Sequence, residues 1–447
     1  DENNGTSPET PKRTVAAANA LCASNVRIRF KRGDTFPCDD TNRISPSGTI
    51  DGLRLEAWGS GAKPILTQAG GSNAPIRINA GGSMSPVNRT DVVFSDLDVR
   101  GSVSSPAAIS SSNSSGNLQH IYFDGCDFQA AAGVTNVVAM EKGSGTNQGW
   151  GLWGFNVISP ETANLGNRMG IFGGAREWTI YFSGRVTGGG SSTVLDHHIY
   201  PTTRNHQLFK WIEFGPGPGR NYCINTNYDQ QGESLEYADC HLISECLFFG
   251  TLRAYDASNG ANDPTETLFR NFVAEGNDFY GLPGDGNILF YCAETMAVRD
   301  NRVWGCSGRW FAPDSGLDDI FAGSVYRNEV YRSSVESGTI ISCGGTWTVA
   351  QQITDNVIED ARTTARLISL DFSDHASASS VIDYNQWYAP NDSNAQPFYD
   401  GAEDESFATW QSAGFDANGS VADPGWTAPA NGVFDAPAAG YVRFTTR

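Results

Sequence analysis

Residues 272–388 contain five short segments that resemble one another, and this repeat constrains the fold more than any other feature of the chain. Each copy has a central asparagine, then one variable residue, and then an apolar residue. The asparagines are 24, 27, 28 and 29 residues apart. Repeats of this length indicate stacked supersecondary units, and a strand-rich unit of this size matches one coil of a parallel β-helix. The central residues are Asn277, Asn301, Asn328, Asn356 and Asn385.

An asparagine suits the bend between two strands of a coil. It tolerates the left-handed backbone conformation, and its side-chain amide can bond backbone groups at a turn. Stacked at the same corner of successive coils, the amides can form a ladder of hydrogen bonds. We therefore expect these asparagines to mark one continuous corner.

The same period continues upstream, where other residues take the place of the asparagine. Successive positions there are 29, 29, 29, 28 and 34 residues apart, and the last lies 31 residues before the first asparagine. This continuity makes unrelated turns in a β-sandwich the weaker alternative and predicts about eleven or more coils. The upstream positions are Leu97, Cys126, Phe155, Gly184, Ile212 and Cys246.

Composition agrees with an all-β protein and limits its partners. The hydrophobic content of 39% can support a sizeable core, and long 3.6-residue apolar patterns are scarce. A net charge of −20 disfavours nucleic acid as a partner. The sequence has no apolar run near the roughly 20 residues that a membrane span needs. The absence of an initial Met fits a mature exported chain, so we expect a secreted monomer, extracellular or periplasmic.

We expect three segments along the chain. Residues 1–12 are a polar, flexible tail. Residues 13–388 form a single β-helix domain, whose exposed first coil is capped by a short Ala-rich helix at 14–21. Residues 389–447 are rich in Asp, Ala, Gly and Pro and are expected to form an irregular tail that packs on the β-helix and caps it.

The nine cysteines are an odd number, so at least one has no partner within the chain. Spacing makes Cys22 and Cys38 plausible disulfide partners, while sequence alone cannot establish the connectivity. The sequence has no CxxC pair or His/Cys cluster that would indicate zinc. Two weaker pairs are Cys223 with Cys240 and Cys292 with Cys306.

Three strings resemble secreted bacterial right-handed parallel β-helix proteins of the pectate-lyase-like superfamily. They are RIRFKRGDTF, AWGSGAKPIL and WQSAGFDANGSVADPGW, and with the repeat they span nearly the whole chain. The resemblance implies a single right-handed β-helix and carbohydrate chemistry. It does not select a reaction, because this superfamily includes lyases, epimerases, hydrolases and tailspike depolymerases. The motif sets of polygalacturonases and alginate epimerases are not found.

A second apolar strand follows each corner by about fifteen residues, and we expect its outer face to bind the ligand. Strand residues alternate between inward and outward directions. If Ile171, Ile199 and Ile224 point inward, their neighbours point outward. His198 and Tyr200 are then two residues apart on one exposed face.

The richest cluster of chemical groups is LDHHIYPTTRNHQLFK at residues 195–210. Its composition fits β-elimination on a uronic acid, where a cation neutralises the carboxylate, a base removes the C5 proton and an acid protonates the leaving oxygen. We assign His198 as base, Tyr200 as acid and Arg204 as the cation, with Lys210 or Arg220 as alternatives. The plainer interpretation is that the histidine pair has no catalytic role, with ordinary polar side chains on a surface strand and His197 in the core.

Further side chains on the same coils are candidate sugar contacts, although many such residues are plain surface. Trp150 and Trp153 can stack on sugar rings or pack beneath a loop. The other substrate-binding candidates are Lys142, Arg168, Asn225, Arg253 and Tyr255.

Two other functions compete with the lyase. Asp256, Glu294 and Asp314 fall on the same strand series and fit an acid–base pair of a glycoside hydrolase, with Asp229 and Glu233 as further candidates. A non-catalytic, tailspike-type binding protein is the third reading. No cofactor is indicated, although clustered aspartates can bind Ca²⁺. The preferred prediction is a lyase that acts on an anionic, uronate-containing polysaccharide.

Overall fold

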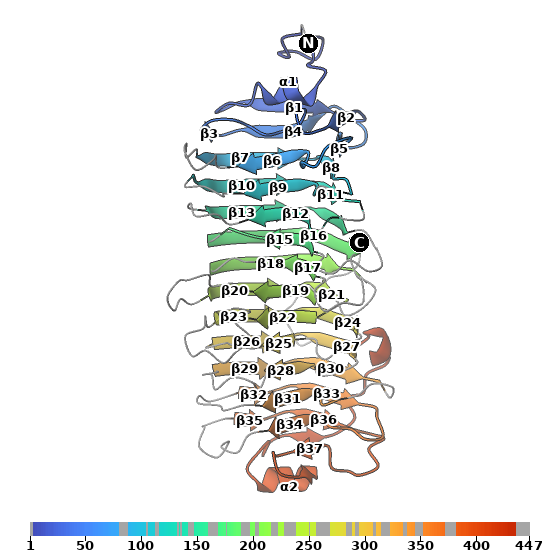
Figure 1. The fold of residues 1–447 in the computed structure, drawn as a ribbon. Helices are drawn as coiled ribbons and strands as arrows, with labels where there is room; N and C mark the ends of the chain where they lie inside the picture. Colours follow the sequence, from blue (N-terminus) through green and yellow to red (C-terminus); the bar gives the residue numbers. More distant parts are fainter. Residues whose placement is uncertain are drawn as a thin grey trace. The chain divides into compact units, whose positions relative to one another are not determined.

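The computed structural model describes the chain in segments, and the chain divides into two compact units, residues 1–221 and 222–447. Each unit is a stack of short parallel strands (Figure 1). The described residues are 3–79, 88–103, 106–111, 116–131, 134, 136–141, 147–159, 169–175, 177–188, 197–201, 205–215, 222–227, 238–249, 251–255, 269–282, 288–290, 295–306, 310–313, 322–333, 338–344, 352–371 and 381–434.

The first unit begins with the predicted helix, α1 (Val15–Asn19), whose N-cap Thr14 accepts a hydrogen bond from the Ala17 N–H. Strands of a larger and a smaller sheet then alternate along the chain. The larger sheet contains β1 (Arg27–Lys31), β2 (Thr35–Cys38), β3 (Ile50–Asp51), β4 (Arg54–Trp58), β5 (Ile65–Gln68), β7 (Arg89–Ser95), β8 (Asp98–Arg100), β10 (Leu118–Asp124), β11 (Asp127–Gln129), β13 (Asn147–Trp153), β14 (Asn156–Ser159), β16 (Glu177–Gly188) and β18 (Asn205–Phe214). The smaller sheet contains β6 (Ile76–Asn79), β9 (Ala108–Ser111), β12 (Asn136–Glu141), β15 (Met169–Gly173) and β17 (His197–Tyr200).

The second unit repeats this arrangement and adds the short helices α2 (Phe407–Ser412) and η1 (Pro429–Asn431). Its larger-sheet strands are β20 (Ala238–Ser244), β21 (Leu247–Phe248), β23 (Phe269–Glu275), β24 (Asp278–Leu282), β26 (Thr295–Arg299), β27 (Arg302–Cys306), β29 (Ala322–Tyr326), β30 (Glu329–Arg332), β32 (Gln352–Thr354), β33 (Val357–Asp360), β35 (Val381–Asp383), β36 (Gln386–Tyr388) and β39 (Ser420–Val421). Its smaller-sheet strands are β19 (Tyr222–Asn227), β22 (Thr251–Tyr255), β25 (Ile288–Phe290), β28 (Phe311–Pro313), β31 (Ile341–Gly344), β34 (Ile368–Asp371), β37 (Phe398–Tyr399) and β38 (Asp404–Glu405).

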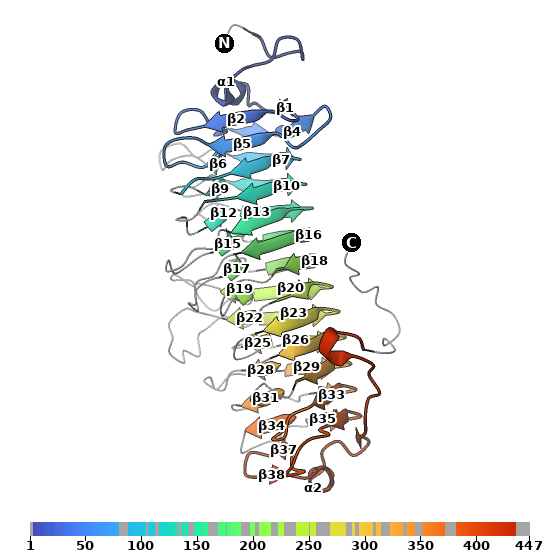
Figure 2. The ribbon, with the colours of Figure 1, turned by 90° about the vertical axis from the view of Figure 1, so that its right-hand side faces the viewer.

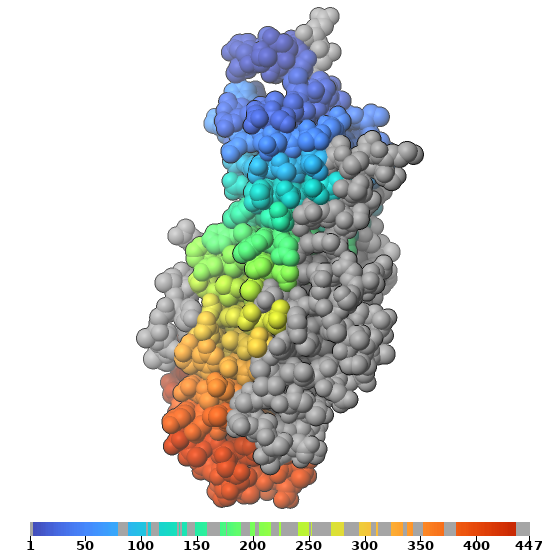
Figure 3. Space-filling view, turned by 90° about the vertical axis from the view of Figure 1, so that its left-hand side faces the viewer, coloured from blue at the N-terminus to red at the C-terminus, as the bar shows by residue number. Residues whose placement is uncertain are grey.

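The predicted all-β parallel β-helix is confirmed. Within each unit, strands from successive coils pair in parallel, and the final pair β37–β38 is antiparallel. In Figure 3, successive coils of the described part appear as bands of neighbouring colour. The described smaller-sheet strands number five in the first unit and seven parallel ones in the second, so the coil count differs slightly from the eleven predicted.

A column of apolar side chains fills the interior behind the smaller sheet. In the first unit, Ile76, Ala108, Val138, Ile171 and Ile199 occupy matching positions on successive strands. Each is at most 1% exposed, as is Ile224 at the start of the second unit. This confirms the expected inward direction of these isoleucines. Burial of such columns is the main hydrophobic contribution to each unit.

The predicted asparagine ladder is confirmed in the second unit. From Asn301 onward, the Oδ1 atom of each asparagine accepts hydrogen bonds from the backbone N–H and the Nδ2 of the preceding one, at 2.9–3.1 Å. Oδ1 of Asn277, the first in the series, accepts the backbone N–H of Cys246. Each Nδ2 also donates to a backbone carbonyl of an earlier coil, as in Asn301 to Ala274. All five asparagines are at most 1% exposed, so the ladder satisfies polar groups that water cannot reach.

The left-handed residue at this corner is the one before the asparagine, which corrects our expectation. In the second unit, positive φ angles of 54–64° occur at Gly276, Asp300, Arg327, Asp355 and Tyr384, each directly preceding a ladder asparagine. The asparagine therefore provides the hydrogen bonds, while its neighbour turns the chain. Because φ is positive in each coil, the bend has the same geometry whichever residue occupies it.

The C-terminal segment ends the ladder with a carboxylate. Asp416 accepts hydrogen bonds from the backbone and the side-chain amide of Asn385, and a further one from Nε1 of Trp387. It lies 31 residues after Asn385, so it occupies the next position of the repeat. Nearby, Trp410 of α2 is fully buried against Phe398. Figure 2 shows the following segment lying along the strands of this unit.

The upstream corner is built from complementary shapes. Gly184 follows Phe155 in the stack, and a Cβ atom at Gly184 would lie 2.3 Å from the Phe155 ring. The aromatic ring therefore occupies the space that the glycine leaves vacant. This explains how the first unit forms the corner without an amide ladder.

The expected disulfides Cys22–Cys38 and Cys223–Cys240 are wrong, since Cys22, Cys38 and Cys223 are all free thiols. Burial raises the pKa of both Cys22 and Cys38 to about 12, so these thiols stay protonated. Cys292 lies outside the described residues, so the third pair is not tested.

The amide ladder is expected to stabilise the second unit strongly. Asn328→Leu removes the acceptor for two donors of Asn301 and leaves them buried, which should cost about 2–3 kcal/mol. The exposed Asn391→Leu should cost less than about 0.5 kcal/mol. Urea unfolding of the two variants measures the difference, and equal losses would contradict a role for the ladder.

Candidate functional site

His198 lies in the interior of the first unit, so the predicted outward direction is wrong. Its side chain is 2% exposed, its ring centroid is 6.0 Å from that of the buried Phe214, and its Nε2 lies 3.1 Å from the Gly188 carbonyl oxygen. Alternation fails because His197, His198 and Ile199 are all buried at the start of β17. Burial lowers the pKa of His198 to about 4, so the ring is neutral but does not reach the surface.

Tyr200 is half-buried at the end of β17, as expected for an outward position. Its ring stacks on Phe172 of the neighbouring coil, with centroids 5.8 Å apart, and lies 5.1 Å from the ring of His197. Tyr200 and Phe172 are thus the outward side chains of the predicted catalytic face that the structure describes on these two coils.

Lys210 does not accompany Tyr200. It lies on β18 of the larger sheet, whereas Tyr200 belongs to the smaller sheet, and its Nζ is 5.0 Å from the centroid of the Trp211 ring. The prediction that it neutralises a substrate carboxylate beside His198 is therefore wrong. Proximity in sequence was misleading because the chain changes sheets between the two residues.

The other predicted site residues are not placed as side chains. Asn225 lies on β19, and Arg253 and Tyr255 lie on β22, where the backbone alone is described. The remaining candidates lie outside the described residues and are Lys142, Arg168, Arg204, Arg220, Asp229, Glu233, Asp256, Glu294 and Asp314.

The two tryptophans of β13 have different roles. Trp150 is 1% exposed, and its Nε1 donates to the Leu118 carbonyl at 3.3 Å, so it is a core residue. Trp153 is half-exposed and lies against Gly151, where a Cβ atom would be 2.5 Å from its ring. Its ring also meets Tyr122 edge-on at 4.9 Å. Trp153 alone of the two can therefore contact a ligand.

A bulge gives the first unit two adjacent outward columns on the larger sheet. His120, Gly149, Trp178 and His206 all have φ between 53° and 69° and follow one another on paired strands. We call this set the bulge column. The residue before each one is also outward, because the left-handed residue adds one position to the strand. These preceding residues are Gln119, Gln148, Glu177 and Asn205, which we call the polar column.

A tyrosine and two carboxylates lie together on the second unit. Glu359 on β33 is directly opposite Tyr388 on β36, and the negative charge of Asp423 acts on both side chains. Burial, and then the negative charge of Asp423, raises the pKa of Glu359 to about 7. Glu359 can therefore hold a proton near neutral pH beside an exposed carboxylate, an arrangement suited to acid–base chemistry.

The sequence analysis did not identify Glu359 and Asp423 as a pair, although the repeat indicates the position of Glu359. Glu359 and Tyr388 each lie three residues after a ladder asparagine, so the period alone stacks them. The same position in earlier copies is Tyr280, Trp304 and Tyr331.

The C-terminal segment approaches this column from outside. The Phe434 ring lies 6.2 Å from that of Trp304, and a Cβ atom at Gly432 would be 2.7 Å from the Trp304 ring. Trp426 in turn packs edge-on against Phe434 at 4.7 Å. Just before Asp423, β39 pairs in parallel with β36, and this pairing holds Asp423 beside Tyr388 and Glu359.

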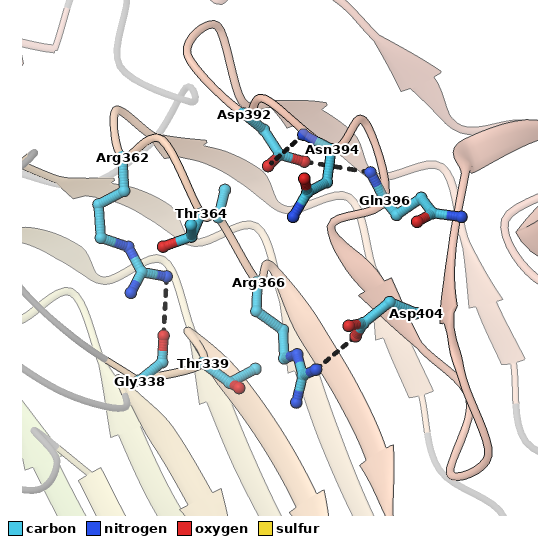
Figure 4. Close-up of a pocket in the computed structure, with 10 residues that line it drawn as sticks. Gly338, Thr339, Arg362, Thr364, Arg366, Asp392, Asn394, Gln396 and Asp404 are labelled. Carbon is cyan, nitrogen blue, oxygen red and sulfur yellow. Dashed lines mark hydrogen bonds and ion pairs between the residues drawn. The ribbon is translucent and has the colours of Figure 1, made fainter.

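A polar pocket of about 300 Å³ lies elsewhere on the second unit (Figure 4). Its charges are already paired, since Arg366 meets Asp404 and Arg362 donates to the Gly338 carbonyl. The carboxylate of Asp392 accepts backbone N–H groups from its own loop. These contacts indicate that the pocket's charged groups fix loops.

Among the residues that the structure describes, no three His, Cys, Asp or Glu side chains converge as a metal site would require. None of the described helices has the length and apolar character needed to cross a membrane.

The buried His198 is expected to make the first unit sensitive to acid. The pKa of His198 in the folded protein lies below the ordinary value of about 6.5. Between these two values the unfolded chain binds a proton at His198 and the folded chain does not. The free energy of unfolding should fall by about 3 kcal/mol as the pH drops from 6.5 to 4. His198→Gln should weaken this dependence, whereas the exposed-histidine variant His120→Gln should keep it. Denaturant unfolding at several pH values checks this, and identical slopes in all three proteins would contradict it.

Comparisons with known proteins do not show a family. No family model and no curated protein matches the chain. Among solved structures, one match is a GH136 lacto-N-biosidase from Eubacterium ramulus, with 10% identity and a TM-score of 0.24. The match covers 94% of this chain and 65% of that one. At this score the likeness supports no argument about function, so the geometry described above carries the proposals below.

Proposed function

We propose that this chain is a carbohydrate-active enzyme that hydrolyses glycosidic bonds, with Glu359 as general acid and Asp423 as the second carboxylate. The observation that carries the proposal is the pairing of Glu359 with Tyr388 beside Asp423, where burial and that negative charge raise the pKa of Glu359 to about 7. One protonated and one exposed carboxyl group are the two components that glycoside hydrolysis requires.

In this mechanism the Glu359 carboxyl donates its proton to the glycosidic oxygen as the bond to the anomeric carbon breaks. Asp423 stabilises the positive charge that develops on the sugar ring. A water molecule then supplies the hydroxyl group of the new reducing end and returns its other proton to the Glu359 carboxylate. Tyr388, opposite Glu359 and near Asp423, can donate a hydrogen bond to the substrate or to the Asp423 carboxylate.

Aromatic side chains favour a sugar as the substrate. Tyr331 and Tyr388 lie on either side of Glu359 along the column, each one strand away. Strand spacing of about 4.8 Å places the tyrosine rings within reach of a sugar held at Glu359. The proposed partner is therefore a polysaccharide, and the proposed location of the protein is outside the cell.

A second candidate is β-elimination at the first unit, favoured by one observation. Tyr200 is outward and stacked on Phe172, where it can protonate a leaving oxygen. His198 is buried and cannot act as the base there, so the base and the cation would come from other side chains of that face.

Glu359→Gln is expected to lower kcat at least about 100-fold, because glutamine cannot donate the proton. The wild-type kcat should fall as the pH rises through about 7, since the acid form of Glu359 is then lost. Reducing ends released from a panel of polysaccharides measure both effects. The exposed control Glu403→Gln should keep the wild-type rate and pH profile; an unchanged rate in Glu359→Gln would remove the proposed acid.

The two reactions differ in their products. Hydrolysis consumes water and gives reducing ends without ultraviolet absorbance, whereas elimination gives an unsaturated uronate that absorbs. Absorbing products that disappear in Tyr200→Phe but persist in Glu359→Gln would favour the second candidate. Retention of polysaccharide without any cleavage would indicate a binding protein.

A further inference from the structure

The bulge column of the first unit contains a tryptophan in an unfavourable position. Trp178 has φ of 62° and is 55% exposed. A bulky residue in the left-handed region is a conformational outlier, and such strain is concentrated at functional sites. The same column position holds Asp91, a residue type that accepts this conformation readily. Neither the fold nor the core therefore requires a tryptophan here.

One face of Trp178 is covered, and among the described residues no ring contacts the other. His206 stacks on the first face with centroids 4.0 Å apart and an interplanar angle of 10°. On the opposite side the next column position is Gly149, which carries no side chain, and the edge of the His120 ring lies 2.6 Å from where its Cβ atom would be. A ligand ring laid on this open face would lie above the glycine backbone and meet the edge of His120.

Polar groups border this open face. Gln148 and Glu177 are directly paired on neighbouring strands of the polar column. The Glu177 carboxylate is held by Asn205, which donates to Oε1 at 2.8 Å, and by His206, whose Nδ1 lies 3.3 Å from Oε2. An apolar platform edged by fixed hydrogen-bonding groups matches a sugar ring, which has apolar C–H faces and hydroxyl groups around its rim.

Charge selects among saccharides. Glu177 borders the platform, and Asp91 lies 2.9 Å from Nδ1 of His120 at the end of the bulge column. These carboxylates disfavour an anionic sugar or a nucleic acid, as does the net charge of −20.

We propose that Trp178, with the glycine backbone at Gly149 and the polar edge of Gln148 and Glu177, forms a binding subsite for a neutral saccharide. It lies on the first unit and uses none of the residues assigned to cleavage, so it goes beyond the proposed hydrolysis. Stacking holds the sugar ring, and the amide and carboxylate bond its hydroxyl groups.

The test is gel retardation with xylan, laminarin or galactan in the gel, and polygalacturonate as the anionic comparison. All proteins carry Glu359→Gln to prevent degradation. At least one neutral polysaccharide should retard the parent, and Trp178→Asn should bind it about tenfold more weakly. Asparagine favours the left-handed backbone, so this variant should fold at least as well, which thermal unfolding checks.

Two further variants sharpen the outcome. Gly149→Asn places beside Trp178 a side chain that tolerates φ of 69° and displaces the His120 ring, so it should also lose retardation. Tyr384→Ala removes an exposed, left-handed aromatic residue of the second unit and should not. Equal retardation of the Trp178 variant and the parent would overturn the proposal. So would retardation of the parent by polygalacturonate or an oligonucleotide but by no neutral polysaccharide, or the absence of any retardation. Full cleavage by Glu359→Gln would remove the hydrolytic proposal and leave this test intact.

Discussion

The hydrogen bond between stacked asparagine amides is the interaction on which the second unit depends. A solenoid corner buries backbone N–H groups that have no strand partner, and a buried donor without an acceptor is costly. Each amide oxygen serves two donors of its neighbour, and each amide nitrogen serves a carbonyl. Asp416 closes the series by accepting the last donors, so the C-terminal segment completes the ladder chemically.

Because the corner has the same geometry in every coil, residues at the same number of positions after it lie above one another along the stack. Residues three positions after the asparagines form one outward column, where Glu359 and Tyr388 meet. One residue further, Arg332 and Asp360 are fully buried. Glu359 and Asp360 illustrate the consequence. Burial raises the pKa of Glu359, whereas burial of Asp360 is outweighed by the guanidinium groups of Arg362 and Arg332, which lower its pKa. Adjacent carboxyl groups thus acquire opposite properties, one suited to proton transfer and one to structure.

The first unit reaches the same architecture by other means. Its corner relies on complementary shapes such as Phe155 over Gly184, and its larger sheet carries a column of left-handed residues. That bulge exposes two neighbouring side chains per coil, so rings and polar groups form parallel columns on one surface. The two units thereby present different chemistry, carboxyl groups on one and an aromatic platform on the other.

The sequence by itself determined whatever depends on regular spacing. The period predicted the parallel coils, the shared corner, the amide ladder and the inward isoleucines, because register repeats the same local geometry in every coil. Only the tertiary structure decided the features that break this regularity. His198 is buried because three consecutive residues of β17 are enclosed, which simple alternation does not anticipate. Lys210 and Tyr200 separate because the chain changes sheets between them. Asp423 reaches Glu359, 64 residues earlier, because β39 pairs with β36 and brings the residues after Val421 beside Tyr388; this strand belongs to the C-terminal segment, outside the asparagine repeat.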